Sequence, residues 1–132
     1  MDASSFSVLV LGGDGIGPEV TEAACTVLEK AAGNSGIRID IEYDLLGGAA
    51  YEQHGVFCTD HTVEKASQVN AVLIGAVGGP KWDQIKIDGG PQDKDGLMRL
   101  RQPLTVYAGL RPARGYPALS PPTPFRGGLA HQ

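Results

Sequence analysis

Residues 8–20 read VLVLGGDGIGPEV, and this stretch decides the fold of the chain. It predicts a buried strand, a glycine-rich turn and the start of a helix, because an apolar run stops at residues that tolerate positive φ and a proline follows. Pro18 suits the first helical position, and Glu19 suits the positive end of the helix dipole. The turn is therefore expected to present backbone N–H groups toward one spot, where they can hold an anion or a cofactor.

The spacing of these glycines leaves two interpretations open. Turns of this kind also occur in α/β proteins that bind no ligand there. The pattern Gly13-x-Gly15-x-Gly17 is not the G-x-G-x-x-G dinucleotide fingerprint, because Pro18 occupies its last position. It also lacks the Gly-Lys-Ser/Thr ending of a P-loop. Spacing alone therefore does not decide between a cofactor site and a structural turn.

The rest of the pattern alternates short strands with helices. Strands are predicted at residues 6–11, 37–45 and 71–76, and helices are predicted up to about residue 32 and at 49–54, 61–68 and 96–101. Such alternation is typical of an α/β fold whose parallel strands are joined by right-handed crossovers. The first strand is expected at the centre of the sheet because its apolar content is nearly continuous. The second alternates apolar with charged residues and is expected at an edge.

Local signals predict how these elements pack and end. The first helix is expected to bury its apolar positions, which are Val20, Ala23, Ala24, Val27, Leu28 and Ala31. Asp60 is expected to cap the helix at 61–68, and Pro103 to end the helix at 96–101, in which Leu97 and Leu100 are expected to be buried. Residues 75–91 are expected to form a long irregular stretch and 104–110 an extended segment.

Composition limits the classes of function. The chain of 132 residues is sufficient for one domain, since domains commonly have ~100–200 residues. Its net charge of −4 provides no cationic surface for nucleic acid or for an anionic membrane. Cys25 and Cys58 lie outside any metal or redox spacing, and no apolar run approaches the ~18 residues of a membrane span. We therefore expect a soluble, cytoplasmic protein with reduced thiols that binds neither nucleic acid nor a membrane.

Four blocks of sequence together resemble the isocitrate and isopropylmalate dehydrogenase family. They are GDGIGPE at 13–19, GAVGGPKWD at 75–83, LMRLR at 97–101 and YAGLRPAR at 107–114. Their order and spacing are most similar to the N-terminal part of the branch that acts on 3-isopropylmalate, over residues 7–117. The resemblance implies a homodimeric oxidoreductase of leucine biosynthesis that oxidises the 2-hydroxyl of its substrate with NAD. It also implies loss of carbon dioxide, helped by Mg²⁺ or Mn²⁺.

The resemblance also implies roles for individual residues. Arg101 and Arg111 would bind substrate carboxylates, a role that suits a planar, always-charged donor. Leu97 and Met98 would face the apolar branch of the substrate. The residues implied to lie near NAD are Ile16, Gly79, Pro80, Lys81, Trp82, Asp83 and Lys94. Judged from the residues alone, the arginines could also be solvated side chains, and Leu97 and Met98 could also be plain core.

Some features depart from the family pattern. Lys94 stands where isopropylmalate enzymes usually carry a glutamate, and Pro103 interrupts a helix that the family continues. The family's catalytic tyrosine and lysine, a third arginine and the metal-binding aspartates follow the matched region. We therefore expect neither catalytic residues nor metal ligands in this chain, which would comprise a domain at 1–117 and a disordered Pro/Gly-rich tail at 118–132.

Three hypotheses about function follow from these departures. The first is a truncated product that is inactive and poorly stable by itself. The second is a non-catalytic partner of a full-length paralogue. The third keeps the enzyme class but changes the substrate to tartrate, malate or homoisocitrate.

Overall fold

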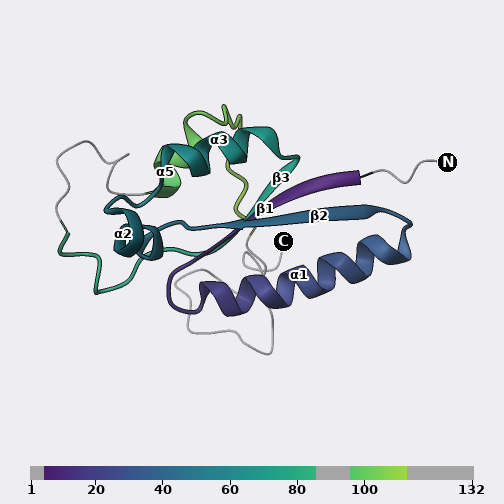
Figure 1. Cartoon of the computed structure of the whole chain (residues 1–132), viewed down its shortest axis with the longest axis horizontal. Coiled ribbons are helices and arrows are strands. Elements are labelled where there is room, and N and C mark those ends of the chain that lie inside the picture. Colours follow the sequence, from purple (N-terminus) through teal and green to yellow (C-terminus); the bar gives the residue numbers. More distant parts are fainter. Residues whose placement is uncertain (1–4, 86–95, 113–132) are drawn as a thin grey trace, which may run out of the picture.

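The computed structural model of the chain describes residues 5–85 and 96–112. In order, these form β1 (Ser5–Gly13), α1 (Gly17–Asn34), β2 (Arg38–Asp44), α2 (Gly48–His54), α3 (Asp60–Gln68), β3 (Ala71–Ala76) and α5 (Gly96–Arg101) (Figure 1). The strands form a three-stranded sheet in the order β2-β1-β3, with both pairs parallel. The predicted α/β class, the central place of β1 and the edge place of β2 are confirmed.

Alternate side chains of β1 point into two different layers. Val8 and Val10 pack with Cys25 of α1 on one face of the sheet. Leu9 and Leu11 pack on the other face, where Ala66 of α3 and Leu100 of α5 complete the cluster. Figure 1 shows α1 on one side of the sheet and both α3 and α5 on the other. A strand covered on both faces needs apolar residues at every position, which explains the unbroken run at 8–11.

The buried face of α1 overlaps only in part with the one that we predicted, because Leu28 packs against Val8, Val10 and Cys25 as expected but other predicted positions do not. Val20 and Val27 are 46% and 68% exposed, whereas Thr21, Cys25 and Ala32 are buried. The buried residues recur at intervals of four and seven, as helical geometry requires, but two of them are not aliphatic. The Thr21 hydroxyl donates to the carbonyls of Gly17 and Pro18, at 3.0 Å each, and so can be buried. An analysis that counted only aliphatic positions selected the wrong phase.

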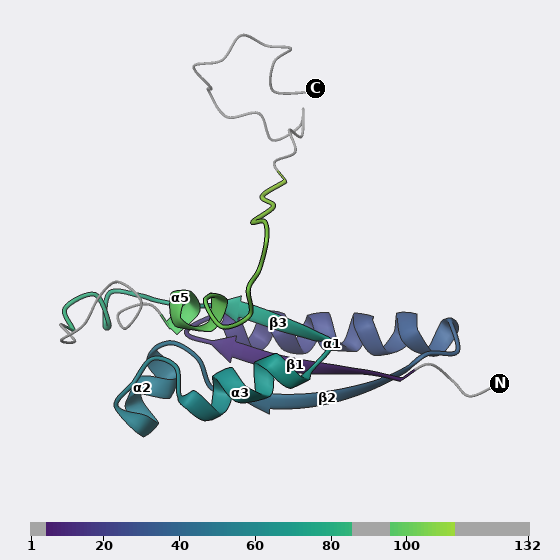
Figure 2. The same cartoon turned by 90° about the horizontal axis from the view of Figure 1, so that it is seen from above.

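Several local predictions need smaller corrections. The cap of α3 is Thr59, whose hydroxyl accepts from the backbone N–H of Thr62, and Asp60 is the first helical residue. Leu100 is fully buried, whereas Leu97 is only partly buried. Tyr43, one of the apolar residues in the alternating stretch predicted as the second strand, is exposed. Residues 104–110 form no strand, and the chain leaves the sheet beyond α5 (Figure 2).

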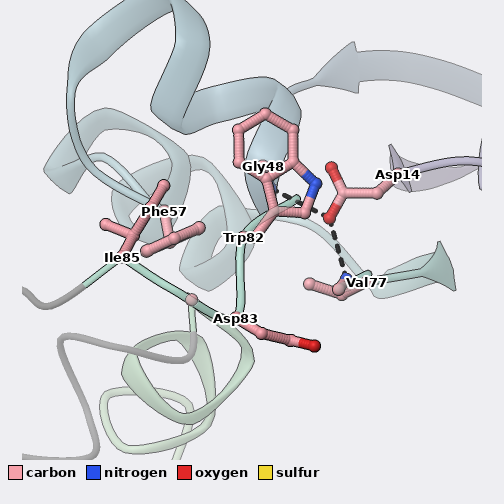
Figure 3. Close-up of a pocket in the computed structure, with 9 residues that line it drawn as sticks. Asp14, Gly48, Phe57, Val77, Trp82, Asp83 and Ile85 are labelled. Atoms are coloured by element: carbon pink, nitrogen blue, oxygen red, sulfur yellow. Dashed lines mark hydrogen bonds between the residues drawn. The ribbon is translucent and has the colours of Figure 1, made fainter. Parts of the chain in front are cut away.

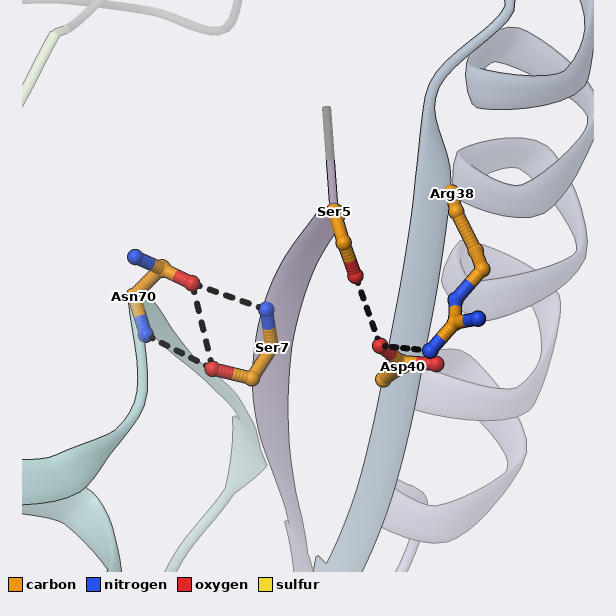
Figure 4. A network of polar contacts seen from close by, with 5 residues as sticks. All are labelled: Ser5, Ser7, Arg38, Asp40 and Asn70. Atoms are coloured by element: carbon orange, nitrogen blue, oxygen red, sulfur yellow. Dashed lines mark hydrogen bonds and ion pairs between the residues drawn. The ribbon is translucent and has the colours of Figure 1, made fainter. Parts of the chain in front are cut away.

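Polar contacts fasten the amino end of β1 to both of its neighbours. Asn70 accepts from the backbone N–H of Ser7 at 2.9 Å and from its hydroxyl at 3.1 Å. On the opposite side, Asp40 accepts from Ser5 at 2.7 Å and from Arg38 at 3.0 Å (Figure 4). Hydrogen bonds from Arg38 and Ser5 lower the pKa of the Asp40 carboxyl. These contacts lie far from the carboxyl ends of the strands, where the candidate site is found.

Some predictions fall outside the described residues. The irregular stretch at 75–91 is described only to residue 85, while Lys94 and the tail at 118–132 are not described at all. In the described ranges, no helix is both long enough and apolar enough to cross a membrane.

Candidate functional site

The candidate site lies where the three parallel strands end. Asp14 follows β1, Gly48 begins α2 after β2, and Gly78 follows β3. Loops after the carboxyl ends of parallel strands meet at one edge of the sheet, which is the usual position of ligand sites in α/β proteins. The sequence block at 13–19 is thereby brought beside the block at 75–83.

The Asp14 carboxylate occupies the centre of this edge. It accepts three backbone N–H bonds, from Gly48 at 2.9 Å, Ala49 at 2.7 Å and Gly78 at 2.8 Å. The Asp14 backbone N–H donates to the carbonyl of Ala76 at 2.6 Å, and its carbonyl accepts from Gly17 at 2.8 Å. The side chain is largely enclosed, with the residue only 7% exposed. The N–H groups that converge here are therefore already satisfied by a carboxylate of the chain itself.

Trp82 packs against the first residue of α2. A Cβ atom added at Gly48 would overlap the indole ring, so glycine is needed for this close approach. Tyr51 meets the ring edge-on at 6.4 Å between centroids, and Lys81 places its Nζ 4.5 Å from the ring centroid. Lys81 also pairs with Glu52 of α2. The segment 79–83 is thus held along one side of α2.

Two pockets flank this segment. One, of about 330 Å³, lies between Asp14, Phe57 and the loop residues Trp82, Asp83 and Ile85 (Figure 3). The other, of about 360 Å³, is lined by residues that include Gly15, Gly79, Pro80, Lys81 and Trp82. Of the predicted cofactor residues, Gly79, Pro80 and Lys81 line only the second pocket, Asp83 lines only the first, and Trp82 lines both. Ile16 is exposed and lines neither pocket, and Lys94 is outside the described residues.

The predicted substrate residues gather at a third pocket, of about 580 Å³, beside β3. Leu97, Arg101 and Arg111 line it together with apolar side chains from α3, β3 and residues 104–108. Met98 does not line it and is 41% exposed. Arg101 and Arg111 form no ion pair with a described residue, whereas Arg99 pairs with Asp60 at 2.5 Å. Two cationic groups and an apolar wall therefore share one opening.

Helix α5 connects the two regions. Gly96, its first residue, lines the pocket beside Trp82, and Leu97 lines the pocket that holds the arginines. The two pockets thus meet consecutive residues at the start of one short helix.

Neither the Cys58 thiol nor the described acidic groups form an evident reactive or metal-binding cluster. Burial raises the pKa of the Cys58 thiol to about 11, so the thiolate is scarce near neutrality. Within residues 5–85 and 96–112, no group of three His, Cys, Asp or Glu side chains could hold a metal ion.

Comparisons with known proteins identify the family. The sequence model for isocitrate/isopropylmalate dehydrogenases matches residues 7–132, which extends past residue 117, where we expected the resemblance to end. The chain therefore belongs to the isocitrate/isopropylmalate dehydrogenase family, a family of oxidoreductases.

The relatives and solved structures agree with this placement. A 3-isopropylmalate dehydrogenase from Pseudomonas putida is 47% identical over 116 residues, which are 88% of this chain and 32% of that protein. One from Hydrogenovibrio crunogenus is 48% identical over 113 residues, or 86% of this chain and 31% of that protein. The crystal structure of a beta-decarboxylating dehydrogenase from Thermococcus kodakarensis superposes with a TM-score of 0.58 at 30% identity, covering 76% of this chain and 27% of that one. The chain thus spans about a third of the length of its curated relatives.

The sequence analysis missed the role of Asp14. It treated the block at 13–19 as a source of N–H donors, whereas the side chain at its centre is an acceptor. The available signal was the acid itself, because an aspartate among glycines after a buried strand is well placed to accept backbone N–H groups.

Proposed function

We propose that this chain supplies part of the substrate and cofactor site of an NAD-dependent 3-isopropylmalate dehydrogenase. Such an enzyme oxidises the 2-hydroxyl group of its substrate and releases carbon dioxide. The single observation that carries the proposal is the shared pocket of Leu97, Arg101 and Arg111. A substrate with two carboxylates and an apolar branch matches two cationic groups beside an apolar wall.

In this proposal the arginines bind and orient the substrate. Arg101 and Arg111 are available for substrate carboxylates, because neither is neutralised by a described acidic side chain. Leu97, which lines the pocket, contacts the isopropyl branch, whereas Met98 lies outside the pocket and makes no contact with it. Arg99, which pairs with Asp60, instead fastens α5 to α3. Binding of the carboxylates fixes the hydroxyl-bearing carbon relative to the neighbouring pocket.

The residues beside Trp82 suit one end of NAD. Atoms added at the Cβ positions of Gly15 and Gly78 would meet nothing within 4 Å, so both glycines leave open space against the backbone. In the proposal, the segment 79–83, Lys94 and Ile16 would lie near the nicotinamide end of NAD, which would supply the hydride acceptor for the oxidation. Mg²⁺ or Mn²⁺ would need ligands outside the described residues, and we assign none here.

Binding of 3-isopropylmalate to the chain tests the proposal. We expect saturable shifts in the methyl NMR signals of Leu97 and Leu100 on titration with 3-isopropylmalate. Malate, which lacks the isopropyl branch, should bind about 5- to 150-fold more weakly, since a branch of this size contributes ~1–3 kcal/mol in an apolar pocket. Tighter binding of malate or tartrate would instead support a change of substrate.

Two arginine variants make this titration specific. Arg101→Gln should weaken binding of 3-isopropylmalate by about 10- to 150-fold, because a hydrogen bond to a charged group is worth ~1.5–3 kcal/mol. Arg38→Gln removes a guanidinium at the opposite end of the strands and should leave the affinity unchanged. Equal affinities for the two variants, or no saturable shift in the unaltered chain, would refute the proposal.

A further inference from the structure

The Asp14 side chain joins three segments that are distant in sequence. One oxygen, Oδ2, accepts from Gly48 at 2.9 Å and from Gly78 at 2.8 Å, and Oδ1 accepts from Ala49 at 2.7 Å. The partners are 34, 35 and 64 residues away along the chain. Figure 3 shows this carboxylate lying between the start of α2 and the turn after β3, beside Trp82.

This position suits a side chain that accepts hydrogen bonds at both of its end atoms. All three partners are N–H donors, so the side chain must accept at both of its oxygens and donate nothing. The amide of an asparagine would turn its own NH₂ group toward at least one of these donors and lose that bond. The positive end of α2 adds a favourable interaction with a negative charge.

The contacts of Asp14 continue into the loop that carries Trp82. Gly78 directly precedes the segment 79–83. Within this segment, the backbone N–H of Trp82 donates to the carbonyl of Gly79 at 2.9 Å. The indole ring then rests on Gly48, whose N–H is also bound by Asp14. The loop is consequently attached to the start of α2 at two points. Asp14 links Gly78 to Gly48 by hydrogen bonds, and the Trp82 ring packs on Gly48.

We infer that Asp14 is a positioning residue, whose carboxylate fixes the loop at 79–83 against α2 before any ligand arrives. The inference rests on the proposed function, in which this loop contacts the cofactor. Asp14 itself acts as the bound anion of this site and occupies the N–H groups that another α/β protein would offer to a phosphate. Its effect on ligand binding is exerted through Gly78 and Trp82.

Trp82 provides a direct readout, because it is the only tryptophan in the chain. In Asp14→Asn, we expect a red shift of its fluorescence emission and a larger acrylamide quenching constant, measured without ligand. In Asp14→Ala, the vacated space should admit formate, which should restore the emission of the unaltered chain. Chloride at the same ionic strength should not restore it, because chloride cannot accept the N–H bonds in the geometry of a carboxylate.

Asp40→Asn is the matched control. It makes the same chemical change in another carboxyl group that accepts hydrogen bonds. Asp40 accepts one from Ser5 and one from Arg38, at the far end of the sheet (Figure 4). We expect the emission and quenching of Trp82 in this variant to equal those of the unaltered chain. A red shift in Asp40→Asn as large as that in Asp14→Asn would assign the effect to general loosening and overturn the inference.

Hydrogen exchange on the unaltered chain provides a test that needs no variant. The amides of Gly48, Ala49 and Gly78 should exchange much more slowly than those of Gly79 and Lys81. If Asp14→Asn does not fold, as shown by loss of its circular dichroism signal, the exchange rates of the unaltered chain test the inference instead. Fast exchange at the three bound amides, or unchanged Trp82 fluorescence in a folded Asp14→Asn, would overturn the inference.

Titration with NAD separates this inference from the proposed function. If the variants alter Trp82 as expected but NAD changes neither its fluorescence nor the loop signals, the proposed function fails and the role of Asp14 stands. If NAD binds and Asp14→Asn leaves its affinity unchanged, the positioning role fails and the proposed function stands.

Discussion

At the scale of single residues, the partner of a charged or polar group separates a structural role from a binding role. Arg99 is paired with Asp60, whereas Arg101 lines a pocket and has no acidic partner among the described residues. The same reasoning applies to the acids, because Asp14 is enclosed and accepts three backbone bonds while Asp83 is exposed. Residues that look equivalent in the sequence motifs therefore have different tasks.

Cys58 gives a prediction about pH at this scale. Burial raises its pKa from 9.0 to about 11, so the folded chain keeps the thiol proton after the unfolded chain has released it. Because the folded state then binds more protons, the free energy of unfolding should fall as pH rises from 9 to 11. Urea unfolding at several pH values checks this. Cys58→Ala should make the dependence shallower, and an unchanged slope would contradict the assignment.

At the scale of elements, the buried face of α1 depends on residues that an aliphatic pattern overlooks. Thr21 and Cys25 face the sheet, and Val27 faces solvent. The strands and the ends of β3 and α5 were predicted correctly because apolar runs and Pro103 mark them in the sequence itself. The phase of α1 was not predicted correctly. Thr21 can be buried because its hydroxyl bonds to carbonyls of its own helix, and aliphatic spacing does not reveal such bonds.

Charged substitutions in α1 distinguish the two phases. Cys25→Asp should lower the free energy of unfolding by more than ~2 kcal/mol, because it buries a carboxyl group without a partner against Val8 and Val10. Val27→Asp should change it by no more than ~0.5 kcal/mol, as for most surface substitutions. Denaturant unfolding of both variants measures the difference. A larger effect at Val27 would support the phase that the sequence alone suggested.

The same limit applies to the candidate site. The residues at 79–83, Leu97, Arg101 and Arg111 were selected because family motifs mark them; the structure places them around pockets, and their roles stay predictions. Asp14 could not be assigned from the motif, because its role depends on Gly48 and Gly78, which only the parallel sheet brings close. A sequence motif does not indicate which distant segments come into contact.

At the scale of the whole molecule, the described fold leaves apolar surface open to solvent. Val106, Tyr107 and Leu110 are exposed, and β2 and β3 are the outer strands of the described sheet. Unpaired strand edges and exposed apolar groups favour association and reduce cooperativity. The chain also spans about a third of the length of its curated relatives.

We therefore expect the isolated chain to unfold at low temperature and over a broad range. Calorimetry and circular dichroism check this, and spectroscopic work on the chain is best done near ~10 °C, close to the usual temperature of maximum stability. A single sharp transition with equal calorimetric and van't Hoff enthalpies would contradict the expectation.

The most direct test of the proposed function is a chimera with a relative. Residues 7–117 of this chain would replace the matching segment of the Pseudomonas putida 3-isopropylmalate dehydrogenase, and NADH formation would be followed with 3-isopropylmalate as substrate. We predict activity that falls about 10- to 150-fold in kcat/KM with Arg101→Gln and is unaffected by Arg38→Gln. A chimera that folds like the relative yet forms no NADH would show that this chain does not carry a working half of the site.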